Sequence, residues 1–255
     1  MPHGRVLELW RWPVKSMGGE RLRSTLVDAR GAGGDRTHAV LHFHKGAWRP
    51  LTAREAPRLL AWHAGYPSAR DASLRPDRPP YVQVTAPGGE RTWRWDDPGL
   101  LTALADDLGR PVRLRRDPDG IQDLGSSVLV TIEATRAALA EELDARVALG
   151  RFRPNVHLEL DAPPWAEDGW EGGTLRFAGG AVLRLLHPCV RCAIPTRDPE
   201  TQAKWPALLK HLAARHGTRF GINARVLQSG RLALQAPVQV VPPAEGATEP
   251  GPSRR

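Results

Sequence analysis

Two cysteines, three residues apart, are the most reactive side chains of this sequence. Cys189 and Cys192 lie in the segment 187–201 and are the only cysteines among 255 residues. A pair at this spacing cannot build a disulfide framework. Arg191 stands beside them, and a guanidinium stabilises a neighbouring thiolate, which is both a nucleophile and a ligand for soft metals. The pair is a candidate for chemistry, although two small buried side chains would also explain it.

The cysteine loop follows a predicted β-hairpin. Residues 174–178 and 181–186 are predicted strands, and Gly179-Gly180 between them is typical of a two-residue hairpin turn. The second strand runs almost directly into Pro188, and proline is expected to end regular strand pairing. The sequence therefore predicts the cysteines at a strand end, on a loop of the kind that commonly carries reactive groups.

The composition is that of an ordinary globular protein with many turns. Of the 255 residues, 41% are hydrophobic and 25% are charged, which suits one large domain or two modest ones. Glycine (25 residues) and proline (24 residues) both exceed average usage. This excess favours short strands joined by turns over helical bundles.

The charge balance is basic, with a formal net charge of +8. Such a balance suggests an anionic partner such as a phosphate group. Because the arginines are scattered rather than clustered, we expect no nucleic-acid partner. No stretch approaches the roughly 20 apolar residues of a membrane helix, and the first residues lack an apolar signal-peptide core. We therefore expect a cytoplasmic protein without a membrane span.

Turn residues divide the chain into predicted strands and a few helices. Asp97, Pro98 and Gly109 are the residue types expected at the cap, first position and end of a short amphipathic helix. Further helices are predicted at residues 133–147 and 203–216. Besides the hairpin, strands are predicted at residues 6–10, 25–28, 39–44, 81–85, 156–160, 223–227 and 231–241. The predicted fold class is mainly β with a few helices (α+β), in barrel-like sheets.

Three separated segments resemble one protein family. Residues 9–20, with Pro-Val-Lys-Ser after a strand, resemble the opening of MOSC N-terminal β-barrel domains. Residues 151–155, Arg-Phe-Arg-Pro-Asn, resemble a motif inside MOSC domains. Residues 191–201 resemble that family's cysteine motif, Arg-Cys-x-x-x-Thr-x-Asp-Pro-x-Thr-Gly, with Gln202 in place of the final glycine. The segments occur in the family's order and the resemblance covers nearly the whole chain.

The resemblance implies two β-rich domains. We expect a MOSC N-terminal β-barrel domain over residues 1–120, a MOSC β-barrel domain over residues 121–242, and a disordered tail over residues 243–255. The tail is rich in proline, glycine and charged residues and has no apolar pattern. A cofactor site is expected between the domains, because Lys15 and Cys192 come from different halves of the chain.

The resemblance also implies a function. The two-domain form resembles the mitochondrial amidoxime reducing component and its bacterial relatives. It implies a molybdenum cofactor of the molybdopterin type, with one protein cysteine on the metal, and reduction of small N-hydroxylated substrates. Cys192 lies at the family's ligand position, which implies that it is both the catalytic residue and the metal ligand and that Cys189 does not carry the chemistry; the role of Cys189 stays open. At family level the resemblance further implies an association with pyridoxal phosphate binding.

Cations and small polar side chains of the matched motifs are expected to bind this cofactor. Arginine would hold phosphate and pterin oxygens with a planar fork of donors, and lysine would act as a point charge. Hydroxyl and amide groups would add neutral donors and acceptors. The expected cofactor-binding residues are Lys15, Ser16, Arg36, Arg153, Asn155, Arg191 and Thr131. Because two cysteines cannot hold a four-cysteine iron–sulfur cluster, a reductase of this sequence requires a separate electron-donor protein.

Three other interpretations remain open at this stage. Cys189 and Cys192 followed by His211 and His216 form an imperfect Cys₂His₂ zinc pattern, with a longer gap than usual. A thioredoxin-like Cys-x-x-Cys site should open a helix in a βαβ unit, and none is visible. The third alternative is a non-catalytic sulfur carrier or cofactor-binding protein in the assembly of metal–sulfur cofactors.

Overall fold

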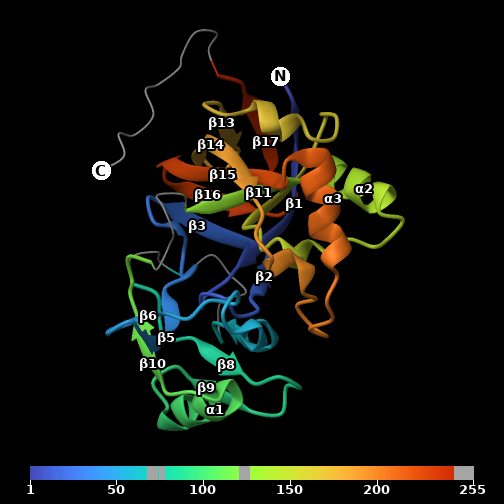
Figure 1. Ribbon diagram of the computed structural model, residues 1–255. Helices are drawn as coiled ribbons and strands as arrows, with labels where there is room; N and C mark the ends of the chain where they lie inside the picture. The colour runs from blue at the N-terminus through green and yellow to red at the C-terminus, as the bar shows by residue number, and fades with distance from the viewer. Residues whose placement is uncertain (68–73, 75–77, 121–126, 244–255) are drawn as a thin grey trace.

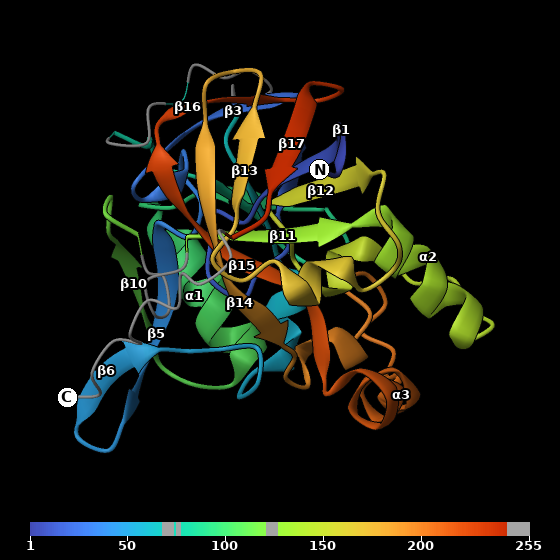
Figure 2. The ribbon, with the colours of Figure 1, turned by 90° about the horizontal axis from the view of Figure 1, so that it is seen from above.

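A closed β-barrel dominates the computed structural model, which describes residues 1–67, 74, 78–120 and 127–243. Neighbouring strands follow the order β12-β11-β15-β14-β13-β17-β1, and pairing of β1 with β12 closes the ring, while β2 extends from β1. Figure 2 looks onto this ring from above. The strands are β1 (His3–Arg11), β2 (Glu20–Leu22), β11 (Val128–Ile132), β12 (Val156–Leu160), β13 (Thr174–Phe177), β14 (Val182–Val190), β15 (Arg219–Gln228) and β17 (Pro237–Val241).

The first strand of the chain belongs to a barrel that is otherwise built from the second half. β1 runs antiparallel to both β12 and β17. Its inward side chains Val6 and Leu9 are buried in one hydrophobic cluster with Val156 and Leu158 of β12. Gly4 permits close contact with β12, since a Cβ there would lie 1.9 Å from the backbone oxygen of Glu159. The barrel core is therefore shared between the two ends of the sequence.

The rest of the N-terminal half forms a second layer below the barrel in Figure 1. Two three-stranded antiparallel sheets, β10-β5-β6 and β7-β8-β9, surround a second hydrophobic cluster that includes Trp62, Trp95 and Leu104. The strands are β5 (His38–His44), β6 (Ala47–Pro50), β7 (His63–Gly65), β8 (Gln83–Thr85), β9 (Thr92–Arg94) and β10 (Val112–Arg116). A 3₁₀ turn, Pro57–Ala61, and helix α1 (Pro98–Leu108) complete this layer.

A small third sheet packs against the barrel, because its residues Val27, Ala32 and Leu232 belong to the barrel's hydrophobic cluster. It has the order β16-β3-β4, with β3 (Ser24–Asp28), β4 (Gly31–Ala32) and β16 (Gly230–Ala233). The segment that follows β1 also makes parallel bridges from Val14 to His38 and from Gly18 to His63. The residues after β1 are thus held between the barrel and the N-terminal sheets.

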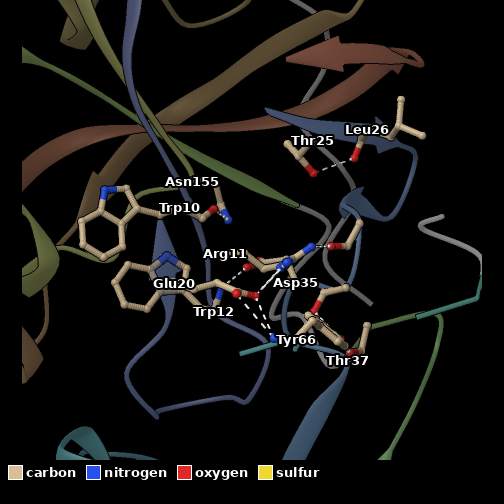
Figure 3. A network of polar contacts seen from close by, with 12 residues as sticks. Trp10, Arg11, Trp12, Glu20, Thr25, Leu26, Asp35, Thr37, Tyr66 and Asn155 are labelled. Carbon is tan, nitrogen blue, oxygen red and sulfur yellow. Dashed lines mark hydrogen bonds and ion pairs between the residues drawn. The ribbon is translucent and has the colours of Figure 1, made fainter. Parts of the chain in front are cut away.

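A buried ion pair anchors the end of β1. Arg11 is 1% exposed, and its Nε donates a 2.8 Å hydrogen bond to Glu20 while Nη1 donates to the carbonyl of Gly33. Its guanidinium lies 4.6 Å from the ring centroid of Tyr66. Figure 3 shows Arg11 of β1 together with Glu20 of β2 and Tyr66, the residue after His63–Gly65. Burial raises the pKa of Glu20 even though Arg11 opposes the shift. The direction of the chain after β1 is therefore fixed by the buried Arg11–Glu20 ion pair and its hydrogen bonds, and not by apolar contacts alone.

Helices α2 (Glu133–Glu142) and α3 (Pro206–His216) pack on one side of the barrel. They share a third hydrophobic cluster, which consists of Leu139, Val147, Phe152, Leu208, Leu212 and Phe220. Within it, the rings of Phe152 and Phe220 are stacked with centroids 3.7 Å apart. The cluster links the helices to the turn that precedes β12.

Several expectations are confirmed and several are wrong in detail. The mainly β fold with a few helices is confirmed. The cap of α1 is as expected, with the Asp97 carboxylate accepting from Gly99 N and Gly109 in the left-handed conformation. The helix expected at 133–147 ends at Glu142, because Asp144 has a φ of 45° that stops it. The single strand expected at 231–241 is two strands, β16 and β17, with Gln235 at a φ of 62° between them.

The expectation that Pro188 ends strand pairing is also wrong. β14 continues to Val190, and Pro188 stands opposite Ile222 of β15. Register shifts on both sides of Pro188 accommodate the missing backbone N–H. The division near residue 120 stays a prediction, and the expected tail lies outside the described residues from position 244. In the described part of the chain, no helix is long and apolar enough to cross a membrane.

Removal of β1 should prevent the barrel from folding cooperatively. A chain that begins at residue 12 leaves the facing edges of β12 and β17 unpaired and removes Val6 and Leu9 from the core. We expect this variant to lack the cooperative thermal transition that the full chain shows by circular dichroism. A sharp transition of similar enthalpy in the truncated chain would contradict the shared barrel.

Candidate functional site

A cavity of about 230 Å³ lies where the two layers meet. Its lining combines residues just after β1 with residues of the barrel strands and their loops. The lining residues are Lys15, Ser16, Arg36, Ser127, Val128, Leu129, Phe152, Arg153, Asn155, Cys189, Arg191, Ile194 and Asn223. Four of them are cations, and no acidic side chain of the described residues lines the cavity.

Arg153 is the most deeply held of the cations. Its Nη1 donates a 2.5 Å hydrogen bond to the carbonyl of Met17, and its guanidinium lies 4.3 Å from the ring centroid of Trp12. Burial, together with the charges of Arg36 and Arg191, lowers the pKa of Arg153 to about 9. Its Nη2 is buried and has no hydrogen-bond partner among the described residues. Arg153 therefore brings a positive charge and an unpartnered donor to the cavity wall, and an anion would satisfy both.

Arg36 is oriented by buried acceptors. Its Nη1 donates to the carboxylate of Asp35, and also to Asn155 Oδ1 at 3.3 Å. Asp35 is held in turn by the backbone N–H of Trp12 at 2.7 Å. The Nη2 of Arg36 donates to the carbonyl of Arg153 at 3.4 Å. These contacts join Arg36 of the N-terminal half to the 151–155 motif of the second half.

Three of the lining residues have a left-handed backbone. The φ angles are 71° at Ser16, 48° at Arg36 and 56° at Arg153. Residues with a Cβ adopt this region at a cost on the order of 1 kcal/mol or more, and such residues gather at functional sites. Two of the three matched segments, 9–20 and 151–155, thus carry local strain at a polar lining residue, and Arg36 adds a third strained position outside the matched segments.

Arg191 links the cysteine segment to the cavity wall. Its Nη2 donates a 2.7 Å hydrogen bond to the carbonyl of Phe152, and its Nη1 donates at 2.9 Å to Cys189 Sγ. Its Nε is buried without a partner in the described part of the chain. Cys189 lines the cavity, whereas Cys192 is exposed and lies outside the lining. Both thiols are free.

The remainder of the cysteine motif fastens its loop. Arg151 donates through Nη2 to Asp198 at 2.7 Å and through Nη1 to the carbonyl of Pro195 at 3.2 Å. Asp198 also accepts backbone N–H bonds from Glu200 and Thr201. The carboxylate therefore shapes the turn after Cys192 and ties it to the 151–155 motif, rather than facing the cavity.

The structure brings most of the expected cofactor residues together. Lys15, Ser16, Arg36, Arg153, Asn155 and Arg191 all line the cavity. Ser16 Oγ accepts from Ala53 N at 2.9 Å, and Asn155 Oδ1 accepts from Leu129 N at 3.1 Å, so both also hold the backbone. Thr131 does not reach the cavity, because its buried hydroxyl is paired with His157 Nδ1 at 2.9 Å.

Sequence reasoning missed several lining residues. Ser127 has a buried hydroxyl without a partner in the described ranges, and Asn223 contributes an amide from β15. Neither lies in a matched motif, so no signal pointed to them. Phe152 lies inside the Arg-Phe-Arg-Pro-Asn motif and could have been found there. Cys189, whose role the sequence left open, also lines the cavity.

The zinc alternative is not supported by the positions of its residues. His211 and His216 contact Glu142. Among the described residues, the group of three potential metal ligands contains these histidines with Glu142 and neither cysteine. A Cys₂His₂ site is therefore not formed.

Comparison with known proteins identifies the family. Residues 119–239 match the MOSC domain, and residues 3–94 match the MOSC N-terminal beta barrel domain. None of the curated proteins matches the chain significantly. The solved YuaD protein from Bacillus subtilis shares 14% identity at a TM-score of 0.52, over 96% of this chain and 99% of that one. At this identity the likeness shows a shared fold.

Two partial likenesses concern YiiM proteins. YiiM from Geobacillus stearothermophilus shares 22% identity over 49% of this chain and 58% of that one, at a TM-score of 0.39. YiiM from Escherichia coli shares 15% identity over 47% and 56%, at 0.35. The two family matches together show that this chain belongs to the MOSC domain proteins with a MOSC N-terminal β-barrel domain.

An oxyanion should stabilise the protein through Arg153. Because a ligand that binds the folded state alone stabilises it by mass action, sulfate or phosphate should raise the thermal midpoint in differential scanning fluorimetry. We expect Arg153→Gln to lose most of this increase. Arg113→Gln is the matched control, since Arg113 is an exposed arginine on β10, outside the cavity lining. Equal increases in all three proteins would show that the cavity does not bind the anion.

Proposed function

We propose that this MOSC protein binds a molybdenum cofactor of the molybdopterin type in the cationic cavity and reduces small N-hydroxylated compounds. The observation that carries the proposal is the convergence of Arg36, Arg153 and Arg191 on one cavity that no described acidic side chain lines. Family membership adds the association of MOSC domains with molybdenum cofactor sulfurase-like proteins. The negatively charged phosphate of the cofactor would be the partner that these guanidinium groups do not find in the cavity lining.

The residues fit such a group on structural grounds. Arg153, Arg191 and Ser127 all line the cavity, and each has a buried polar side-chain atom without a partner among the described residues. Arginine forks suit phosphate oxygens and the polar edge of a pterin. Lys15, Ser16 and Asn155 add a further cation, a hydroxyl and an amide to the wall. A thiolate is a suitable soft ligand for molybdenum.

We propose Cys192 as the thiol that binds molybdenum. It stands in the Arg-Cys segment of the family's motif, and its exposed position would leave the metal open to a substrate and to an electron donor. Cys189 is held by Arg191 inside the cavity and would help to position that guanidinium. The Arg151–Asp198 pair would hold the loop against the cavity wall while substrate and product exchange.

The reaction requires two electrons and two protons for each substrate. An N–OH bond is broken, the nitrogen gains a proton, and the oxygen leaves as water. When bound, the cofactor would supply the two-electron oxygen-atom transfer. The chain's own cations would bind and orient the cofactor. We propose that the electrons come from a separate protein, and the basic charge of this chain suits an acidic donor whose docking weakens with salt.

A sulfur carrier is the second candidate function. The exposure of Cys192 favours it, since a thiol that accepts and hands over a sulfur atom must be reached by other proteins. In that case the cationic cavity would hold an anionic acceptor rather than a resident cofactor. The two functions differ in whether molybdenum stays bound and in what is released at Cys192.

Molybdenum retention should separate the two cysteines. We expect protein purified from a host that makes the cofactor to hold about one molybdenum per chain, by elemental analysis. Cys192→Ser should lose most of the metal because its ligand is removed, whereas the matched Cys189→Ser should keep it. Retention in both variants, or loss in Cys189→Ser alone, would show that the assignment of Cys192 is wrong.

Amidoxime reduction should be measurable with a chemical electron source. We expect cofactor-loaded protein to reduce benzamidoxime when a low-potential viologen dye replaces the missing partner, and Cys192→Ser to lose nearly all of this activity. The amidine product is measured by chromatography. Metal-replete protein that turns over no N-hydroxylated compound, but releases sulfide from Cys192 on reduction, would contradict the reductase and favour the sulfur carrier.

A further inference from the structure

A second group of metal-ligating side chains lies away from the cationic cavity. Glu142, His211 and His216 place one carboxylate oxygen and two imidazole nitrogens within 4.8 Å of one another. Glu142 Oε2 lies 2.5 Å from His211 Nε2 and 2.7 Å from His216 Nε2. None of the three lines the cationic cavity, so the proposed function makes no use of them.

The two helices position these ligands. Glu142 is the last residue of α2, and His211 and His216 lie in the middle and at the end of α3. Both helices lie on the same side of the barrel in Figures 1 and 2. The ring of Trp165 stacks on His216 with centroids 3.6 Å apart and an interplanar angle of 13°. The orientation of one imidazole is thus held by packing, as in sites where the surroundings orient the ligands.

We propose that Glu142, His211 and His216 bind a divalent transition metal ion, of which Zn²⁺ is the physiological candidate. Two imidazoles and a carboxylate are a preferred ligand set for zinc, with water as the fourth ligand. The side chains are 27%, 21% and 14% exposed, respectively, which leaves access for the ion and for that water. In the metal-free protein one carboxylate oxygen accepts hydrogen bonds from both rings.

Metal binding exchanges those hydrogen bonds for coordination. Each imidazole binds the ion through Nε2 as the neutral ring, with its single proton on Nδ1, so the proton that Nε2 donates in the metal-free protein is moved to Nδ1 by exchange with solvent. Zinc bonds of roughly 2.0–2.2 Å require ligand atoms roughly 3.3 Å apart in a tetrahedral site. The Glu142 oxygen must therefore move away from each imidazole nitrogen by somewhat less than 1 Å. Because all three side chains are partly exposed, rotation of the side chains can make this change without backbone movement.

The ion would join two helices that otherwise meet through apolar contacts. α2 and α3 share the hydrophobic cluster that contains Leu139, Leu208, Leu212 and Phe152. Phe152 also lines the cationic cavity, and Arg191 donates to its carbonyl. Zinc at this position would stabilise the corner of the molecule that supports the cavity wall. Its role would be structural, and it would be independent of the ligand in the cavity.

The experiment measures Zn²⁺ binding to the full chain without interference from thiols. The background protein carries Cys189→Ser and Cys192→Ser and is freed of metal with a chelator. Isothermal titration with zinc alone is compared in this background and after adding His211→Ala or Glu142→Gln. His3→Ala is the matched control, because His3 is an exposed histidine on β1. Circular dichroism confirms that each variant is folded.

We expect one equivalent of zinc in the background protein and in the His3→Ala control. Loss of an outer-shell partner already weakens metal sites by 10–100-fold, so loss of a ligand should weaken binding by about tenfold or more. Cobalt substitution should give the intense visible bands of a tetrahedral ion in the background protein and not in His211→Ala. Zinc binding that disappears with the cysteines, or that survives both Glu142→Gln and His211→Ala, would overturn the proposal.

Discussion

The insertion of β1 between β12 and β17 is the constraint on which the rest of the structure depends. This pairing closes the barrel of the second half with a strand from the first. It also brings the residues after β1 to the 151–155 motif: Trp10 N bonds to the carbonyl of Asn155 at 2.9 Å, and Trp12 Nε1 to that of Pro154 at 2.8 Å. Because the two residues of each pair lie about 140 positions apart in the sequence, they meet only when β1 closes the barrel. The cavity therefore exists only in the closed barrel.

The electrostatics of the cavity follow from that closure. Asp35 partly neutralises the charge of Arg36. Arg153 remains buried beside two other guanidinium groups. Its lowered pKa shows that burial and repulsion make its charged form less favourable. Strained backbone at Ser16, Arg36 and Arg153 adds to this cost. Three guanidinium groups gathered in this way are suited to an anion, which would relieve their repulsion and occupy the unpartnered donors.

Local signals in the sequence predicted the elements better than their pairing. The cap residues of α1 and the Gly179-Gly180 turn act over a few positions, so their types are readable from the chain. The contact of β1 with β12 depends on a long-range choice that no local pattern specifies. Lys15 and Arg153, both expected to bind the cofactor, line one cavity, whereas Cys192, which was expected in the same cleft as Lys15, lies outside its lining. The sequence predicted that the strand ends at Pro188. Instead, β14 continues past Pro188 with register shifts on both sides. Which of Cys189 and Cys192 lines the cavity could therefore not be predicted from the sequence.

The measurement that tests the central claim most directly is anomalous diffraction at the molybdenum K edge, on crystals of protein made in a host that supplies the cofactor. The account predicts a single anomalous peak at the mouth of the cationic cavity, bonded to Cys192 Sγ, with pterin density running inward to Arg36 and Arg153. A peak elsewhere on the molecule, or a cavity that holds only solvent in protein with full molybdenum content, would contradict it.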